Sequence, residues 1–327
     1  MRQRLRVIRT LARLRMNFRI LPATMLLGGS LALAQVHVDK NVPYGMYSGL
    51  ALLMDVHRPV QPNGYGLIVI AGSGWNSSQA YDAQPLTALT SSVRYFVPKL
   101  LDAGYTLFVV NHRNGPRFHY PAAVEDVQRA VRYIRYSAKN YAVDPDRIGA
   151  VGYSSGAHLV ALLGVLDGKG DAQDPDPVNR VSARVQCVVA AATATDLEHF
   201  DAGGGVPVVV SFMGQLRPGK GGAQPDPVAV RAYREASPIA YVSASSAPLL
   251  LLHGDVDEVV PFHQAEIMFE AMKNAGGDVK LIRLPGGGHG FAGQTAQHPD
   301  WPNFFVESVR WLDWHLKTTA GAATPHQ

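Results

Sequence analysis

Short, mainly apolar runs recur along the chain and are separated by stretches in which apolar residues return every three or four positions. Runs of five or six residues, typical of buried strands, lie at 66–70, 105–110, 147–151, 185–190, 248–253 and 279–284. Residues 127, 130, 131, 134 and 138 form an apolar helical stripe, and a last helix is expected over about 303–317. This alternation predicts an α/β domain with a mostly parallel, twisted sheet and helices on both faces.

The segment Gly152-Tyr153-Ser154-Ser155-Gly156 stands between one of these strands and the mostly apolar helical run 157–163. In a strand–turn–helix context, G-x-S-x-G is the signature of a nucleophile elbow, in which the two glycines make room for a sharp turn. The Ser154 hydroxyl is then presented at a helix N-terminus, where negative charge is favoured. Ser154 is therefore the candidate nucleophile.

A serine hydroxyl needs a base to remove its proton and an acid to orient that base, and in this architecture they follow in the order Ser, Asp or Glu, His. The loop after the strand 248–253 contains Asp255 and Asp257, and the glycine-rich loop after 279–284 contains His289. We predict Asp257 as the orienting acid and His289 as the base. Asp255 lies nearer the strand end and is better placed to stabilise the loop.

An oxyanion hole is expected in the loop after the strand 66–70, which reads Ala71-Gly72-Ser73-Gly74-Trp75. The backbone N–H groups of Ser73 and Gly74, together with that of Ser155, are the predicted donors to the developing negative charge. The bulky Trp75 is predicted to contact the substrate and to narrow the acyl side of the pocket.

The first 34 residues have the composition of a targeting segment. Seven arginines precede an apolar stretch from Ile20 to Leu33, and Ala32-Leu33-Ala34 forms a small-x-small cleavage site. This pattern predicts a secretory signal peptide over 1–34, with either Met1 or Met16 as the true start. A retained amphipathic or membrane-anchoring helix is the alternative.

Charge and composition exclude some classes of partner and of site. Because residues 1–34 carry those seven arginines and no acidic residue, the formal net charge falls from +4 for the whole chain to −3 for residues 35–327. We therefore expect no nucleic-acid partner. The single cysteine, Cys187, is expected to be buried in a strand as a packing residue. No H-E-x-x-H spacing occurs, so a catalytic metal is not expected.

One catalytic domain is expected over 35–317, followed by a flexible tail over 318–327. Within it, residues 196–242 are rich in glycine and proline and predict a loop-rich lid or pocket wall. The acidic cluster Asp171, Asp174 and Asp176 lacks the glycine and terminal glutamate of a calcium loop and is interpreted as a solvated loop.

From about Leu52 to Leu316 the chain resembles the α/β-hydrolase family, in the esterase branch that contains hormone-sensitive-lipase-like carboxylesterases and, closer still, acetyl-xylan and feruloyl esterase-like proteins. The similar segments are 54–59, 121–127, 144–148, the Ser154 elbow, 236–239, 253–257 and 288–291. The resemblance implies cofactor-free serine esterase chemistry with Ser154, Asp257 and His289 as the triad. Where the family has His-Gly-Gly-Gly-Trp, this chain has 71–75, without the histidine and with Ser73 in place of a glycine. The backbone N–H of Trp75 is the alternative to that of Ser73 in the oxyanion hole.

The sequence thus predicts an exported serine esterase, secreted or periplasmic, that hydrolyses short acyl or aryl esters, either small molecules or groups linked to polysaccharide. An exopeptidase or amidase with the same triad is the main alternative, and a non-catalytic binding protein on the hydrolase scaffold is the third. No stable membrane association is expected after signal cleavage. The sequence leaves the oligomeric state and the natural ester open.

Overall fold

The computed structural model describes residues 36–76, 93–200, 203–215 and 226–318. All of them belong to one compact unit, Gln35–Gln327. The predicted signal peptide lies outside the described residues, as does the predicted tail apart from Thr318.

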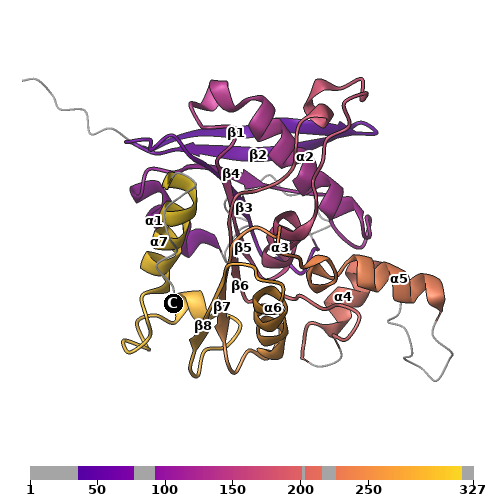
Figure 1. The fold of residues 1–327 in the computed structure, drawn as a ribbon, viewed down its shortest axis with the longest axis vertical. Coiled ribbons are helices and arrows are strands. Elements are labelled where there is room, and N and C mark those ends of the chain that lie inside the picture. Colours follow the sequence, from indigo (N-terminus) through magenta and orange to yellow (C-terminus); the bar gives the residue numbers. More distant parts are fainter. Residues whose placement is uncertain (1–35, 77–92, 201–202, 216–225, 319–327) are drawn as a thin grey trace, which may run out of the picture. The chain divides into compact units, whose positions relative to one another are not determined.

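An eight-stranded sheet forms the centre of this unit, in the order β1-β2-β4-β3-β5-β6-β7-β8 (Figure 1). The strands β3 to β8 pair in parallel, whereas β2 is antiparallel to both β1 and β4. The strands are β1 (His37–Tyr47), β2 (Leu50–Arg58), β3 (Gly66–Ile70), β4 (Thr106–Val110), β5 (Ile148–Tyr153), β6 (Val188–Ala191), β7 (Leu249–Gly254) and β8 (Val279–Leu284).

Helices cover both faces of the sheet, as the alternation of patterns predicts (Figure 1). In this view α1 and α7 lie on one side of the strands and α2, α3 and α6 on the other. The α-helices are α1 (Val97–Asp102), α2 (Ala122–Tyr136), α3 (Ser155–Val165), α4 (Val206–Met213), α5 (Pro227–Glu235), α6 (His263–Asn274) and α7 (Phe304–Lys317). The 3-10 helices are η2 (Val93–Tyr95), η3 (Ala138–Tyr141), η4 (Pro177–Arg180), η6 (Pro238–Tyr241) and η7 (Phe291–Gly293).

The predicted strands are all present, and five of them are buried on both faces, whereas the edge strand β8 is only partly buried. Every residue of β3, β4, β5, β6 and β7 is buried. The hairpin of β1 and β2 was not predicted, since β1 contains asparagine, proline and glycine and exposes most of its length. Cys187 is fully buried, as expected, but it lies just before β6 and not inside it.

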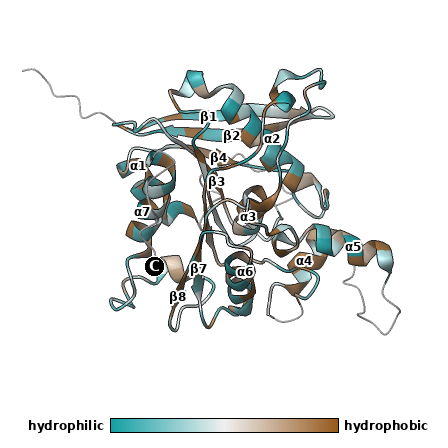
Figure 2. Ribbon diagram, in the orientation of Figure 1, coloured by the Kyte–Doolittle hydropathy of each residue, from teal (hydrophilic) through white to brown (hydrophobic). Residues whose placement is uncertain are grey.

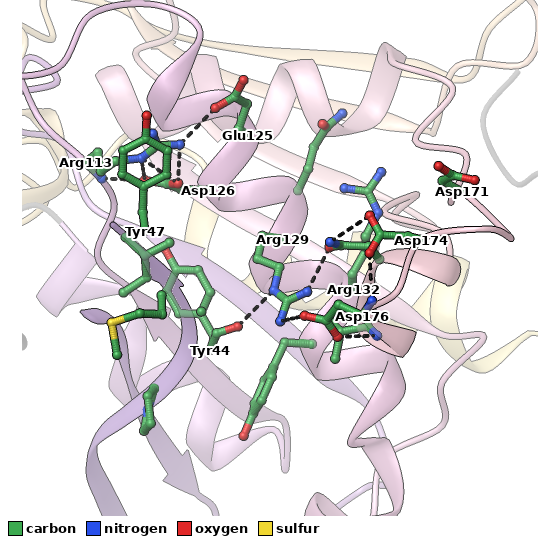
Figure 3. A pocket seen from close by; sticks show the side chains of 18 of the residues that line it. Tyr44, Tyr47, Arg113, Glu125, Asp126, Arg129, Arg132, Asp171, Asp174 and Asp176 are labelled. Carbon is green, nitrogen blue, oxygen red and sulfur yellow. Dashed lines mark hydrogen bonds and ion pairs between the residues drawn. The ribbon is translucent and has the colours of Figure 1, made fainter. Parts of the chain in front are cut away.

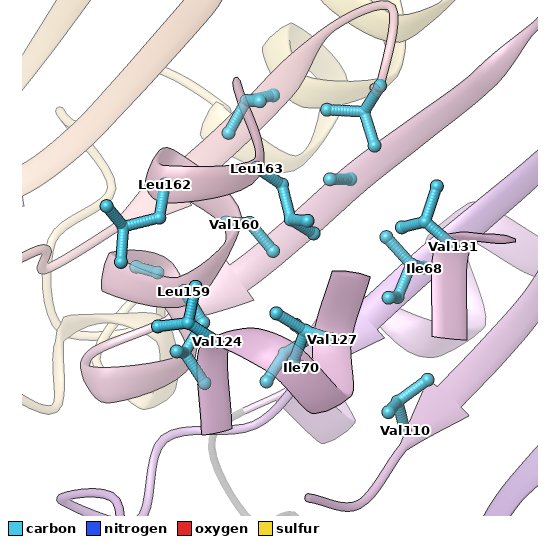
Figure 4. Packing of buried hydrophobic residues seen from close by; sticks show 14 of the residues in the cluster. Ile68, Ile70, Val110, Val124, Val127, Val131, Leu159, Val160, Leu162 and Leu163 are labelled. Carbon is cyan, nitrogen blue, oxygen red and sulfur yellow. The ribbon is translucent and has the colours of Figure 1, made fainter. Parts of the chain in front are cut away.

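Packing against the sheet also holds the helices in place. α3 is buried from Ser155 to Gly164 and is mostly apolar in colour, whereas α6 presents hydrophilic residues (Figure 2). The apolar stripe of α2 supplies Val124, Val127 and Val131 to the same core, where they lie near residues of β3 and α3 (Figure 4). Since α3 begins directly after Ser154, this burial holds the candidate nucleophile in a rigid setting.

The described part of the insertion 196–242 is more regular than its composition predicts. Its α5 starts at Pro227, with the Asp226 carboxylate accepting a hydrogen bond from the Val228 N–H as an N-cap. The short apolar α4 has a proline near its start and ends at Gly214 in a left-handed conformation. In this segment glycine and proline therefore mark the ends of helices as well as occurring in loops. Residues 201–202 and 216–225 lie outside the described part.

Candidate active site

Ser154 occupies a sharp turn between β5 and α3. Its backbone has φ 54° and ψ −123°, a sparsely populated combination that residues at functional sites often adopt. A Cβ atom on Gly156 would lie 2.2 Å from the Ile70 carbonyl oxygen, and one on Gly152 would lie 2.4 Å from that of Gly156. Both elbow glycines are therefore required by close backbone approach, as the motif predicts.

The structure brings Ser154, His289 and Asp257 together from three separate loops. Ser154 Oγ lies 3.0 Å from Nε2 of His289. His289 Nδ1 lies 2.8 Å and 3.0 Å from the two carboxylate oxygens of Asp257. A carboxylate only accepts, so Nδ1 carries the hydrogen and Nε2 faces the hydroxyl as the acceptor. This is the arrangement in which a serine hydroxyl can lose its proton to a histidine.

The surroundings of Asp257 keep its carboxylate charged. Burial of the side chain disfavours the charge, but hydrogen bonds from His253 and His289, and the backbone N–H groups of Val259 and Val260, outweigh it and hold the pKa of Asp257 well below its ordinary value. An ionised acid next to Nδ1 orients the imidazole and stabilises its protonated form.

Asp255 has the structural role that its position near the strand end predicts. Its carboxylate accepts from Nε of Arg283 at 2.8 Å and from the backbone N–H of Gly286 at 2.7 Å. These contacts tie the loop after β7 to the loop after β8, which carries His289. Asp255 thus stabilises the loops, and only Asp257 reaches the histidine.

The predicted oxyanion residues lie beside Ser154, but one of them is already engaged. The backbone N–H of Ser73 donates to Ser155 Oγ at 2.9 Å, so Ser73 is not a donor to an oxyanion in this conformation. The left-handed positions of the loop are Gly74 (φ 64°) and Trp75 (φ 55°), and Ser73 is not among them. The Ser155 N–H lies at the first position of α3, where a helix leaves its N–H groups without an intrahelical acceptor. Gly74 and Ser155 therefore remain oxyanion candidates, together with the backbone N–H of Trp75, which is the alternative to that of Ser73.

The indole of Trp75 points into the protein. It is only 4% exposed, stacks on Phe212 with ring centroids 4.6 Å apart, and donates from Nε1 to His158. Trp75 still contributes to the wall of the cavity beside Ser154. The prediction that it narrows the pocket stays open, but its polar N–H is directed away from a substrate.

Sequence reasoning missed several residues that support the site. The Tyr153 hydroxyl donates to the backbone carbonyl of His289 at 2.6 Å, and the Glu258 carboxylate accepts from the backbone N–H of the same histidine at 3.2 Å. Both hold the histidine loop. His158 was visible in the sequence as the one ionisable residue of an otherwise apolar helix, and that contrast is the signal that could have identified it.

A cavity of about 400 Å³ opens next to Ser154 and His289. Its walls are largely apolar and come from the oxyanion loop, from the start of α4 and from the loop after β7. The apolar lining residues include Phe200, Val208, Val209, Val259 and Val260. The arrangement offers an apolar space for an acyl group directly beside the hydroxyl.

A larger cavity, of about 780 Å³, shares no lining residue with the first and lies between the β1–β2 hairpin and α2 (Figure 3). Several of its charged side chains bind one another. Arg113 pairs with Asp126 and Glu125, and Arg129 pairs with Asp176 (Figure 3). Asp126 is a buried tether, as its place near a helix start suggests. Because these ion pairs join the elements around the larger cavity, we assign them a structural role. The smaller cavity, which lies beside Ser154 and His289, is the candidate active site.

Within the described ranges, no group of three or more histidine, cysteine or acidic residues is arranged to hold a metal ion. Among the same residues, no helix is both long and apolar enough to cross a membrane.

Comparison with known proteins identifies the family of this chain. The BD-FAE family profile matches residues 54–272, which is more than half of the chain. The protein belongs to the BD-FAE family. The α/β-hydrolase fold and the resemblance to acetyl-xylan esterase-like proteins are thereby confirmed.

The relatives of this family member include proteins named as esterases. LipQ, an esterase of Mycobacterium tuberculosis, is 28% identical over 267 residues, which make up 77% of this chain and 57% of LipQ. The acetylxylan esterase of Xylanibacter ruminicola is 25% identical over 246 residues, or 71% of this chain and 42% of that enzyme. The chain thus spans little more than half the length of one relative and less than half of the other.

A solved structure described as a truncated form of a carbohydrate esterase from gut microbiota superposes with a TM-score of 0.69. It is 25% identical in sequence, and the match covers 86% of this chain and 97% of that one. The fold of this protein is therefore close to that of this truncated carbohydrate esterase over nearly its whole length.

Proposed function

We propose that the protein is a serine hydrolase that cleaves carboxylic esters through an acyl-enzyme. The observation that carries the proposal is the continuous hydrogen-bonded series from Ser154 Oγ through His289 to Asp257 at a strained strand–helix turn. Ser154 supplies the nucleophile, His289 the base that takes its proton, and Asp257 the ionised acid that orients the base.

The reaction follows from the positions of the atoms. Ser154 Oγ attacks the ester carbonyl carbon while Nε2 of His289 takes the hydroxyl proton. The N–H groups of Ser155 and Gly74 stabilise the negative oxygen of the tetrahedral intermediate. The imidazolium then gives its proton to the departing alcohol, and water attacks the acyl-enzyme by the same route to regenerate Ser154.

The proposed substrates are esters with a short acyl group, free or attached to a polysaccharide. The apolar walls beside Ser154 suit an acyl chain, and relatives named acetylxylan esterase and carbohydrate esterase support a carbohydrate-linked ester. Peptidase or amidase chemistry by the same residues is the second candidate, because the triad itself does not distinguish an ester from an amide.

Labelling with a fluorophosphonate tests the nucleophile. The wild type should be labelled, and Ser154→Ala should be neither labelled nor active, with a loss in kcat of roughly 10⁴-fold or more on p-nitrophenyl acetate. Ser245→Ala, at an exposed loop position, is the matched control and should behave as the wild type. Hydrolysis by Ser154→Ala at the wild-type rate would refute the assignment.

A substrate panel separates the candidate reactions. It should contain p-nitrophenyl acetate, butyrate and octanoate, methyl ferulate, acetylated xylan and an aminoacyl arylamide. Faster turnover of the arylamide than of every ester would favour the peptidase or amidase. No labelling of Ser154 together with no turnover of any member would favour a binding protein.

We also propose that the protein is exported and loses residues 1–34. The support is the arginine-rich start, the apolar run and the cleavage site at Ala32-Leu33-Ala34. N-terminal sequencing of periplasmic or secreted protein should begin at Gln35 or within a few residues of it. Recovery of the uncleaved chain in the membrane fraction would instead support a retained anchor.

A further inference from the structure

His158 is a fully buried histidine whose two ring nitrogens are both hydrogen-bonded. It lies four residues after Ser154, in the first turns of α3. The Trp75 indole Nε1 lies 3.1 Å from its Nδ1, and its Nε2 lies 2.7 Å from the carbonyl oxygen of Ala236. An indole N–H only donates and a carbonyl only accepts, so Nε2 carries the hydrogen and Nδ1 is the acceptor.

The buried setting keeps this ring in that single neutral form. Burial lowers the pKa of His158 to about 4, although the hydrogen bond to Ala236 opposes the shift. A neutral imidazole with Nδ1 free of hydrogen is the form that can accept from Trp75. The contact between the two side chains is therefore constant over the neutral pH range.

Trp75 needs such an anchor because its backbone is strained. It follows Gly74, and both residues adopt the left-handed conformation, which is rare for a bulky side chain. The indole is held by stacking on Phe212 and by the hydrogen bond to His158, whose ring meets it edge-on at 5.0 Å. Fixing the side chain of Trp75 restrains the loop in which Gly74 directly precedes it.

A second contact ties the same loop to the same helix. The Ser73 N–H donates to Ser155 Oγ at 2.9 Å. Ser155 and His158 both belong to α3, which begins directly after Ser154. The loop that carries the oxyanion donor is thus attached at two points to the helix that carries the nucleophile.

We propose that His158 is a positioning residue: by accepting the Trp75 indole N–H at Nδ1, it sets the distance between the oxyanion loop and Ser154. The inference rests on the proposed function, since this distance matters to a reaction only if Ser154 forms a tetrahedral intermediate. It assigns a purpose to a histidine that takes no part in proton transfer and touches no substrate.

Two substitutions at His158 separate its two hydrogen bonds. The oxygen of an asparagine can take the place of Nδ1 and accept from Trp75, whereas a glutamine amide reaches the place of Nε2 and keeps the bond to Ala236. Trp75→Phe removes the indole N–H and retains a ring to stack on Phe212. His158→Gln and Trp75→Phe should lower kcat on p-nitrophenyl acetate by about 10- to 100-fold, as expected for a displaced catalytic group, with KM nearly unchanged. His158→Asn should retain most of kcat.

The indole proton of Trp75 gives a readout that does not depend on activity. Its signal in a ¹H–¹⁵N spectrum is identified by its loss in Trp75→Phe. The signal should move and exchange faster in His158→Gln, and keep its position more closely in His158→Asn. His199→Gln, at an exposed histidine, is the matched control for both measurements and should change neither.

The outcomes are distinguishable. A wild type that neither binds fluorophosphonate nor hydrolyses esters would refute the proposed function, while the indole signal would still report on the hydrogen bond. With an active wild type, a folded His158→Gln or Trp75→Phe with full kcat would overturn the positioning role. An equal loss of kcat in His158→Asn and His158→Gln would overturn it as well, because the role would then belong to the Ala236 bond or to packing.

Discussion

The carboxylate of Asp257 is buried, yet the groups around it favour its charged form. Since the pKa of Asp257 is lowered on folding, its charge stabilises the folded state above the ordinary aspartate pKa of about 3.9, and that contribution is lost as the pH falls further. We expect the free energy of unfolding to drop between pH 5 and pH 2.5, with about 2 kcal/mol of the drop absent in Asp257→Asn. Denaturant titrations of both proteins at several pH values measure this. Equal acid sensitivity of the two would contradict the assigned charge state.

The same charge simplifies the expected pH dependence of activity. Because the pKa of Asp257 is lowered, its carboxylate stays ionised throughout the range in which the enzyme is assayed, and kcat/KM should decline on the acid side through one ionisation only, that of the general base. A plot of log kcat/KM against pH should approach a slope of one. A slope of two would mean that a second group must also be deprotonated.

At the scale of the secondary-structure elements, α3 and β3 lie so close together that there is no room for a side chain at Gly156. A methyl group on Gly156 would overlap the carbonyl oxygen of Ile70, and neither backbone can move without disturbing the sheet. Gly156→Ala should lower the free energy of unfolding by at least about 3 kcal/mol. Gly290→Ala is the control, since nothing lies within 4 Å of its Cβ position. A stable and active Gly156→Ala would show that the elbow is looser than its contacts indicate.

The loop after β4 is held to α2 by a buried ion pair. Arg113 and Asp126 are both almost fully buried, and the Asp126 carboxylate also accepts from the Arg113 backbone N–H at 2.7 Å. Asp126→Asn leaves a buried guanidinium with a weaker partner and should cost about 3 kcal/mol of folding free energy. Thermal and denaturant unfolding measure the loss. Glu235→Gln, which breaks an exposed pair on α5, should leave stability unchanged, and equal effects of the two changes would contradict the role of burial.

At the scale of the whole molecule, the insertion supplies part of the wall of the cavity beside Ser154, and we expect it to set the acyl groups that fit. Val208 of α4 packs so closely on the oxyanion loop that a Cβ on Gly74 would lie 2.4 Å from its Cγ1. We expect kcat/KM of the wild type to peak at acetyl to butyryl esters and to decline by octanoyl. Val208→Ala should move the optimum toward longer chains, with each newly buried methylene worth about 0.8 kcal/mol.

Matched variants and substrates check this expectation. Val228→Ala, on the exposed side of α5, should leave the chain-length profile unchanged. A wild-type rate that still rises through dodecanoyl esters would contradict the short-acyl prediction while leaving the nucleophile untouched.

The sequence alone determined much of the fold, because the relevant signals are local. Continuous apolar runs identify strands buried on both faces, and a helix that is apolar all round, such as α3, has no stable place outside a core. The elbow at Ser154 was also predictable, because its motif is local in the sequence, although the carbonyl group that excludes a side chain at Gly156 belongs to Ile70 of β3. The sequence further predicted Asp257, and not Asp255, as the orienting acid.

Only the tertiary structure decided how distant loops meet. It showed that Asp257 reaches His289 while Asp255 binds Arg283, and that the Ser73 N–H is already held by Ser155. It revealed the hydrogen bond between Trp75 and His158, two residues that are 83 positions apart. Such contacts depend on the direction of individual N–H groups and side chains. The packing of the whole sheet sets these directions, and they cannot be read from a local pattern of residues.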